Sequence, residues 1–474
     1  MSMISPEELV IPAEVALTAE EGVAPADSST NRLGTALKVV IASSFVLRLA
    51  GASTAFMLGA YLKQVINADT DLIGILAALF YVTELTLAPV FGAISDLRGR
   101  RPILIIGPLL GVIALPIYPL SAIASIAFVG VFILAVARLL EGVSTAAKVP
   151  SALGYLADAT AGDSPERTKM RGRVMGFYEI SFLIGLVGGT ILGGQLWVAL
   201  QTTGFFIISF FYLIATLMLF FFVPETLPTE AREHHTTNKM AVVASSTPVR
   251  ALLKSRLNSY AALLKEPALR TFVPAWLAIN AVVGLMGNLV QPLMIKPRTG
   301  SVSAFPDQIL DGKFETSQVS FIFAGFGVVF MVGILLWSLT YGRIRKTDVM
   351  LAAVAGLFMF CAALFGVNND LLPGILGTIV WMPILVVGIF LVSGFTPIAL
   401  AYLAEISGAR VEHRGAVMGL YSVFLGLGQL IGSGGGGFFI KWVGQGFNGL
   451  ILATGLLGIV ALVAVLWLRR EHAV

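Results

Sequence analysis

The chain has 474 residues, of which 57% are hydrophobic and only 12% charged, and its formal net charge is +4. A soluble chain carries roughly 25% charged residues, so the composition excludes an ordinary soluble protein. The small net charge and the lack of interleaved aromatic and basic residues argue against a nucleic-acid binding site. One cysteine and four histidines, without ligand spacing, indicate no disulfide, no metal site and no bound cofactor.

Apolar runs long enough to cross a ~30 Å hydrocarbon core recur along the chain. Dividing them at charge clusters and at Pro/Gly turns predicts twelve membrane-spanning helices. The predicted spans are 37–62, 71–95, 102–122, 126–157, 173–198 and 204–223, followed by 271–295, 317–341, 348–367, 373–405, 414–440 and 447–468. The sequence therefore predicts an all-α polytopic membrane protein embedded in a lipid bilayer.

Polar stretches flank and divide these spans. The predicted organisation is a disordered cytoplasmic tail (1–36), an N-terminal six-helix bundle (37–223), a cytoplasmic linker (224–270), a C-terminal six-helix bundle (271–468) and a second cytoplasmic tail (469–474). The first tail lacks the basic start and apolar centre of a cleavable signal peptide. In the linker, leucines at helical spacing interleave with basic residues over 248–270, which predicts an amphipathic helix on the membrane surface or packed under the bundle.

Lysine and arginine are distributed unevenly among the predicted loops. With a cytoplasmic N-terminus, the segments on that side hold 23 of the 31, the opposite loops hold five, and three lie inside spans. Positive residues concentrate in cytoplasmic loops. Both termini are therefore predicted to be cytoplasmic, in a cell inner or plasma membrane.

The two halves of the chain resemble each other. RGRVMGFYEISFLIGLVGGTILGG (171–194) and RGAVMGLYSVFLGLGQLIGSGGGG (414–437) agree at 10 of 24 positions. Upstream, PSALGYLAD (150–158) resembles PIALAYLAE (397–405) at nearly the same offset. Two related six-helix halves with a substrate site between them near the midplane are a recurring transporter architecture.

The stretch GAISDLRGRR (92–101), between the second and third spans, carries the most specific motif. It resembles G-x-x-x-D-[RK]-x-G-[RK]-[RK], a signature of the major facilitator superfamily, with Leu97 where a basic residue is usual. The resemblance implies twelve transmembrane helices in two pseudo-symmetric six-helix bundles and transport by alternating access.

Further motifs extend this resemblance over the chain. RLLEG (138–142) is similar to the fourth-helix signature R-x-x-Q-G, with Glu141 in place of glutamine. GLVGGTILGG (185–194) is similar to the fifth-helix antiporter signature G-x-x-x-G-P-x-x-G-G, with Thr190 in place of proline. PET (224–226) ends the sixth span as in many sugar and drug carriers.

Charged residues at the inner ends of the spans are predicted to form a gate. The predicted gating residues are Gly92, Asp96, Gly99, Arg100, Arg101, Asp158, Arg171, Glu405 and Arg414. We expect Asp96 to bind a helix N-terminus of the other half or an arginine, which would latch the inner gate. Topology anchors are the alternative for the arginines of the motif, and plain loop salt bridges are the alternative for Asp158 and Glu405.

Six ionisable residues lie inside spans of the first half: Arg48, Glu84, Arg138, Glu141, Lys148 and Glu179. A charge at the bilayer centre costs at least ~2.5–3.5 kcal/mol, so such residues indicate function. Arg138, Glu141 and Lys148 share one helical stripe. We expect Arg48 to pair with Glu84, and Glu179 with Lys148. Either the six form static ion pairs, or Glu141 or Glu84 carries a coupled proton.

The second half supplies polar and aromatic candidates for contact with substrate. They are Asn280, Asn288, Gln291, Trp381, Tyr421 and Gln429, with ordinary packing as the alternative for the aromatic ones.

The favoured function is a secondary transporter that moves a small organic solute by alternating access, by proton-coupled antiport and efflux. A proton-coupled symporter importing a sugar or organic anion is the alternative. We expect the protein to work as a monomer. A polytopic membrane enzyme would need a catalytic constellation that the sequence lacks, and a transport-dead receptor on the same fold would bind its ligand tightly without flux.

Overall fold

The computed structural model describes residues 26–123, 127–161, 164–226, 266–297, 305–339, 343–408 and 423–471. Several predictions of the sequence analysis lie outside these residues. They concern the first 25 residues, nearly all of the amphipathic stretch 248–270, the side chain of Glu405, and Arg414 and Tyr421.

The first half is built of long helices. They are α1 (Ala26–Gln64), α2 (Thr70–Arg98), α3 (Arg100–Ala114), the short α4 (Ile117–Leu120), α5 (Ala127–Ala159), α6 (Pro165–Leu200), the 3-10 turn η1 (Gln201–Thr203) and α7 (Gly204–Phe222). The second half repeats this pattern with α11 (Pro267–Met294), α12 (Thr316–Leu339), α13 (Lys346–Asn368), α14 (Ile375–Ser393), α15 (Phe395–Gly408), the π-helical turn η3 (Ile431–Gly435), α17 (Gly436–Val443) and α18 (Gly446–Glu471).

The predicted spans correspond to these helices. In the described residues, 11 segments are long and apolar enough to cross a membrane, and one of them, Lys169–Phe222, contains most of α6 and all of α7. The helices therefore agree with the twelve predicted spans. The largest difference is at the start, where α1 begins at Ala26 and its span at Gly34, so helix covers part of the tail predicted for 1–36.

Two predicted spans are each divided between two helices. The span 102–122 is divided into α3 and α4, with Pro116 between them. Proline lacks the backbone N–H that a continuing helix needs. The span 373–405 is divided into α14 and α15 at Gly394, which packs directly against the ring of Trp337.

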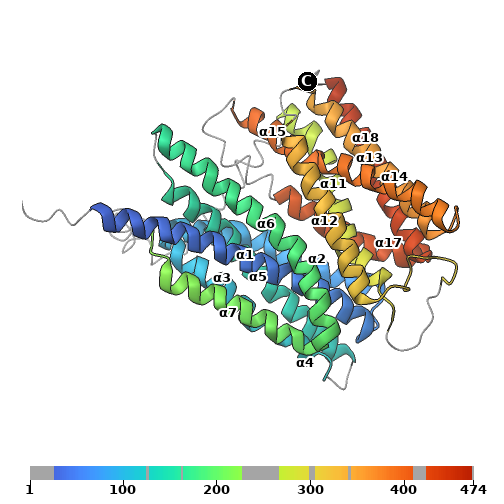
Figure 1. The fold of residues 1–474 in the computed structure, drawn as a ribbon, viewed down its shortest axis with the longest axis horizontal. Helices are drawn as coiled ribbons and strands as arrows, with labels where there is room; N and C mark the ends of the chain where they lie inside the picture. Colours follow the sequence, from blue (N-terminus) through green and yellow to red (C-terminus); the bar gives the residue numbers. More distant parts are fainter. Residues whose placement is uncertain are drawn as a thin grey trace, which may run out of the picture.

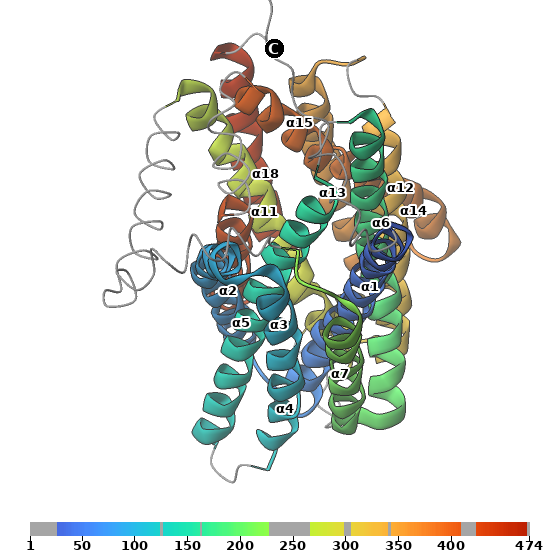
Figure 2. The same cartoon turned by 90° about the vertical axis from the view of Figure 1, so that its left-hand side faces the viewer.

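The helices form two bundles that meet along α1, α2 and α6 on one side and α11, α12, η3 and α17 on the other. Figure 1 shows the first bundle in blue to green and the second in yellow to red. We call the end at which α1 ends and α2 begins the distal end, and the end at which α1 begins and α18 ends the terminal end. The ribbons of the two bundles separate toward the terminal end (Figures 1 and 2).

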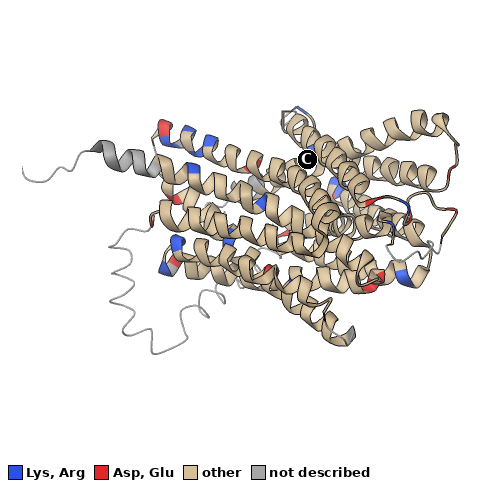
Figure 3. Cartoon of the chain, turned by 60° about the horizontal axis from the view of Figure 1, so that its bottom comes forward, with Lys and Arg blue, Asp and Glu red and all other residues tan. Residues whose placement is uncertain are grey.

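Charge and polarity follow the expected membrane pattern. Most of the coloured charged residues in Figure 3 lie near helix ends, and the lengths between are largely uncharged. Large apolar side chains such as Phe221, Leu339 and Val463 are exposed on the outside of the helices. An exposed apolar surface of this extent is stable in contact with lipid and not with water.

Candidate functional site

The buried centre of the first bundle holds an ion pair. Arg138 and Glu141 lie three residues apart on α5, are only 6% and 5% exposed, and make a 2.7 Å contact between Nη1 and Oε2. The hydroxyl of Tyr118, from α4, donates to the same Oε2 at 2.6 Å. Arg138 also donates from Nε to the Leu76 carbonyl at 3.1 Å, and its guanidinium lies 4.7 Å from the Phe80 ring centre. These partners offset the cost of burying the two charges.

Lys148, about two turns beyond Glu141 on α5, is also buried. Its Nζ lies 3.2 Å from the Tyr212 hydroxyl and 4.9 Å from the centre of that ring on α7. Gly107 of α3 touches the backbone of Lys148 so closely that a side chain would overlap it. The expected pair with Glu179 is not among the ion pairs of the described residues, and Glu179 is exposed on α6.

Arg48 lies on α1 and faces α6. Its guanidinium lies 4.0 Å from the centre of the Phe182 ring. Glu84 on α2 is within electrostatic reach of Arg48, but the two make no direct ion pair within the described part of the chain. The predicted Arg48–Glu84 pair is therefore wrong as a contact, because the flat face of Phe182 holds the guanidinium.

The glycines of the antiporter-like motif place α6 against α1. Side chains at Gly185, Gly189 or Gly193 would overlap atoms of α1. The hydroxyl of Ser53 donates to the Gly189 carbonyl at 2.9 Å. Small residues that let two membrane helices approach closely have this role in general. In this chain the motif builds one wall of the first bundle.

The polar candidates of the second half have different positions. Asn288 Nδ2 lies 3.3 Å from the Tyr81 hydroxyl of the other half and 3.1 Å from Ser433 Oγ. Asn280 donates to a carbonyl of its own helix, at Trp276. Gln429 contributes a backbone carbonyl to Ser433 at 2.7 Å. Asn288 therefore lies where the halves meet, while the described contacts of Asn280 and Gln429 are within the second half.

Trp381 does not match its prediction. Its ring packs against Gly366, between α13 and α14, at a distance that leaves no space for a side chain on the glycine. It therefore serves helix packing, which was the alternative interpretation.

Polar contacts between the halves cluster at the distal end. Gln64 Nε2 donates to the Lys296 carbonyl at 3.0 Å and lies 3.3 Å from Thr316 Oγ1, both in the second half. Its Oε1 accepts a 2.6 Å bond from Trp197 Nε1, in the same half.

Three further side chains take part in this closure. The Thr70 hydroxyl donates to the Gly437 carbonyl at 3.1 Å. Gln291 Nε2 donates to the Phe56 carbonyl across the halves. Lys441 Nζ lies 3.0 Å from Asp69 and 2.8 Å from Asp71. We call the contacts made by Gln64, Gln291 and Lys441 across the halves the distal latch. Only Gln291 was a candidate from the sequence, and there as a substrate contact.

The predicted gating motif lies at the terminal end, where Gly99 adopts φ 110°, a conformation that favours glycine, and α3 begins at Arg100. Arg100 pairs with Asp96 and, at 2.9 Å, with Asp158. Arg171, another predicted gating residue, is exposed on α6.

Glu225, from the PET motif, caps the N-terminus of α3. Its carboxylate accepts bonds from the backbone N–H of Arg100 at 3.0 Å and of Arg101 at 3.1 Å. A carboxylate at this position satisfies donors that the helix itself leaves unpaired. Arg101 Nη2 donates to the Phe220 carbonyl at 2.8 Å. These bonds tie α7 to α3, a role that the motif did not reveal by itself.

The described residues contain no group of three or more His, Cys, Asp or Glu side chains placed to hold a metal ion. The fold and the site instead define a class: a multi-pass membrane protein with two six-helix halves and buried ionisable residues between its helices.

A family model described as the Major Facilitator Superfamily matches residues 40–296 and 298–474. The chain belongs to this superfamily, whose members are membrane transporters and not enzymes.

The solved structures of similar fold include the nucleoside transporter NupG, with a TM-score of 0.67, 13% identity, and coverage of 92% of this chain and 98% of that chain. The xylose transporter XylE from Escherichia coli gives a TM-score of 0.63 at 11% identity, over 93% of this chain and 98% of that chain. At this level of identity the likeness shows the fold alone.

Curated relatives match shorter segments. The tetracycline resistance protein of class C from Escherichia coli is 31% identical over 137 residues, 28% of this chain and 31% of that protein. Multidrug resistance protein 2 from Bacillus subtilis (strain 168) is 28% identical over 205 residues, 43% of this chain and 48% of that protein. The alignments thus cover less than half of these relatives.

Proposed function

We propose that the protein is a proton-coupled antiporter that exports a small organic solute by alternating access. The observation that carries this proposal is the buried cluster of Arg138, Glu141 and Tyr118 in the first bundle. A carboxylate held by one cation and one hydroxyl has a neutral and a charged form that differ in their bonds. Its protonation therefore changes how the surrounding helices are held together.

The direction of transport rests on the relatives and on the fifth-helix motif. Proteins named for tetracycline and multidrug resistance match segments of this chain. The glycines of the antiporter-like motif pack α6 against α1. A proton-coupled symporter that imports a sugar or organic anion is the second candidate, favoured by the buried cations Arg48 and Lys148, which suit an anionic solute.

Glu141→Gln tests the coupling, because glutamine keeps the shape of the side chain but does not titrate. The full-length protein is reconstituted into vesicles, and tetracycline and a panel of lipophilic cations are offered. With one proton exchanged per solute, a gradient of one pH unit supports about tenfold accumulation. We expect Glu141→Gln to lose this accumulation and to retain exchange of solute across the membrane.

Glu166→Gln is the matched control, since Glu166 is exposed in the first turn of α6. It should accumulate solute as the wild type does. Glu84→Gln is the second test, and it should reproduce the loss if Glu84 carries the proton instead. If both single variants and the double variant accumulate solute fully, the glutamates are structural. Antiport and symport are distinguished by adding solute to vesicles with a preset pH gradient. The pH inside the vesicles changes in opposite directions for the two modes.

We further propose that the terminal end is the cytoplasmic end, with both termini inside a cell membrane, and that the protein acts as a monomer. Asp96 and Arg100 then belong to the inner gate, and they would exchange partners when it closes. Asp96→Asn should slow turnover and leave solute affinity unchanged. A tenfold loss of affinity with normal turnover would contradict the gating role, and a periplasmic reporter active after Val474 would contradict the orientation.

A further inference from the structure

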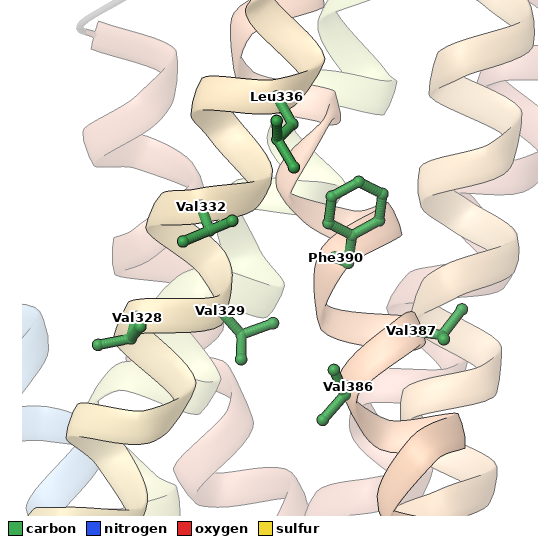
Figure 4. Close-up of a pocket in the computed structure, with 7 residues that line it drawn as sticks. All are labelled: Val328, Val329, Val332, Leu336, Val386, Val387 and Phe390. Carbon is green, nitrogen blue, oxygen red and sulfur yellow. The ribbon is translucent and has the colours of Figure 1, made fainter.

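A groove of about 320 Å³ lies between α12 and α14 in the second bundle. Its walls are entirely apolar: Val328, Val329, Val332 and Leu336 on α12, and Val386, Val387 and Phe390 on α14. Figure 4 shows Val329 and Leu336 of α12 and Val386 of α14 directed toward the space between the two helices, while Val328 and Val387 lie at its outer edges. The groove extends from Val328 to Leu336 of α12, a separation of eight residues that corresponds to roughly 12 Å along the helix axis.

The groove is open on the surface of the membrane-spanning part. Five of its side chains are between 42% and 47% exposed, although both helices lie in candidate membrane spans. The lining residues fall in the second half of each helix, nearer the terminal end. A length of roughly 12 Å approaches half of the ~30 Å hydrocarbon core. The groove is thus long enough and apolar enough to hold one acyl chain of a lipid in one leaflet.

Basic residues follow where the groove ends. α12 continues from Leu336 to Leu339, and Arg343 and Arg345 are exposed directly before α13 begins at Lys346. This loop is at the terminal end, because Asp348 in the first turn of α13 pairs with Arg469 of α18 at 3.1 Å. Basic residues at the end of a cleft between membrane helices attract anionic lipid head groups.

We propose that this groove is a binding site for an anionic phospholipid. One acyl chain lies between α12 and α14, and the phosphate group is held by Arg343 and Arg345. The apolar walls select an acyl chain, and the two guanidinium groups select a negative head group over a zwitterionic one. The site lies outside the buried cluster of the first bundle and does not depend on the transported solute.

The experiment uses the purified, delipidated full-length chain in detergent. Phosphatidylglycerol or phosphatidylcholine with identical acyl chains is added, and bound lipid is counted by native mass spectrometry. We expect at least one phosphatidylglycerol to bind about fivefold more tightly than phosphatidylcholine. The double variant Arg343→Gln/Arg345→Gln should remove this preference, and Val332→Trp, which fills the groove, should reduce the binding of both lipids.

Matched variants separate this groove from the general effects of surface charge and side-chain bulk. Arg167→Gln/Arg173→Gln removes two exposed cations at the same end of the first bundle, and Val463→Trp enlarges an exposed apolar side chain on α18. Both should bind lipid as the wild type does. Val332→Phe is a milder replacement if the tryptophan variant does not fold. Equal binding of the two lipids by the wild type would overturn the proposal. Loss of the preference for phosphatidylglycerol in Arg167→Gln/Arg173→Gln would also overturn it. Unchanged lipid binding by Val332→Trp would do the same.

Discussion

Gln64 offers the sharpest test of the distal latch, because it bonds to both halves at once. Its Nε2 reaches the Lys296 carbonyl and Thr316 in the second half, and its Oε1 accepts from Trp197 in the first half. Gln64→Leu removes all three bonds. Only the two bonds that cross the halves distinguish a closed distal end from an open one, since Trp197 moves with Gln64.

The expected size of the effect follows from this count. A hydrogen bond contributes about 0.5–1.5 kcal/mol net, so two bonds contribute about 1–3 kcal/mol to closure. This free energy corresponds to a change of about 5- to 150-fold in the ratio of distally closed to distally open protein. Gln64→Leu should therefore populate the open form visibly in the absence of solute.

Distances between spin labels on opposite halves measure this ratio. Cysteines replacing Ile123 and Asp370 provide exposed label sites on loops of the two halves, and the native Cys361 is buried. Gln64→Leu should add a longer distance to the distribution. Trp197→Phe is the control, because it removes only the bond within the first half. The reasoning is refuted if Gln64→Leu leaves the distances unchanged, or if Trp197→Phe shifts them equally.

Three other predictions follow from the same contacts. Lys441→Met should also open the distal end, and the difference from wild type should fade above about 0.5 M salt, because its ion pairs with the two aspartates are solvent-exposed. Tyr118→Phe should lower the free energy of unfolding by about 1–3 kcal/mol and slow proton-coupled transport, since Glu141 loses a buried donor. Denaturant titration measures the free energy of unfolding, and vesicle uptake measures the transport. Unchanged proton-coupled transport would show that Tyr118 has no role in coupling. Gly189→Leu should destabilise the first bundle by about 1–3 kcal/mol or more through overlap with α1, whereas Gly287→Leu, at an open position on α11, should melt like the wild type.

The sequence was sufficient to predict the architecture because membrane helices carry their signal locally. Apolar runs of the required length stand out by themselves, and the basic loops and the repeat then give the two bundles. The stripe of Arg138, Glu141 and Lys148 was also predictable, since residues three and four apart share a helix face. These three residues are buried in the structure.

The partners of these charges were not predictable in the same way. Glu141 and Lys148 are held by Tyr118 and Tyr212, which lie 23 and 64 residues away on other helices. The predicted partner of Lys148 was instead a glutamate, because charge is visible in a sequence while the neighbours of a helix face are not. Gln64 was missed for a related reason: a polar residue at the end of a span resembles an ordinary boundary residue until the opposite half is in place.

The strength of the contacts differs within and between the halves, and this difference suits a protein whose halves move. Within the first bundle, the bonds to Glu141 are charge-assisted and buried, and breaking such a pair costs several kcal/mol. Across the halves, the described polar bonds come from neutral amides, from the Thr70 hydroxyl and from an ion pair open to solvent. Weak contacts of this kind can be exchanged for others at the opposite end without a large barrier, while each bundle keeps its shape. Rocking of two rigid bundles around a central site needs strong contacts within each bundle and weak contacts between them. A proton bound at Glu141 would act on the first bundle by changing the packing of α5 against α4 and α2.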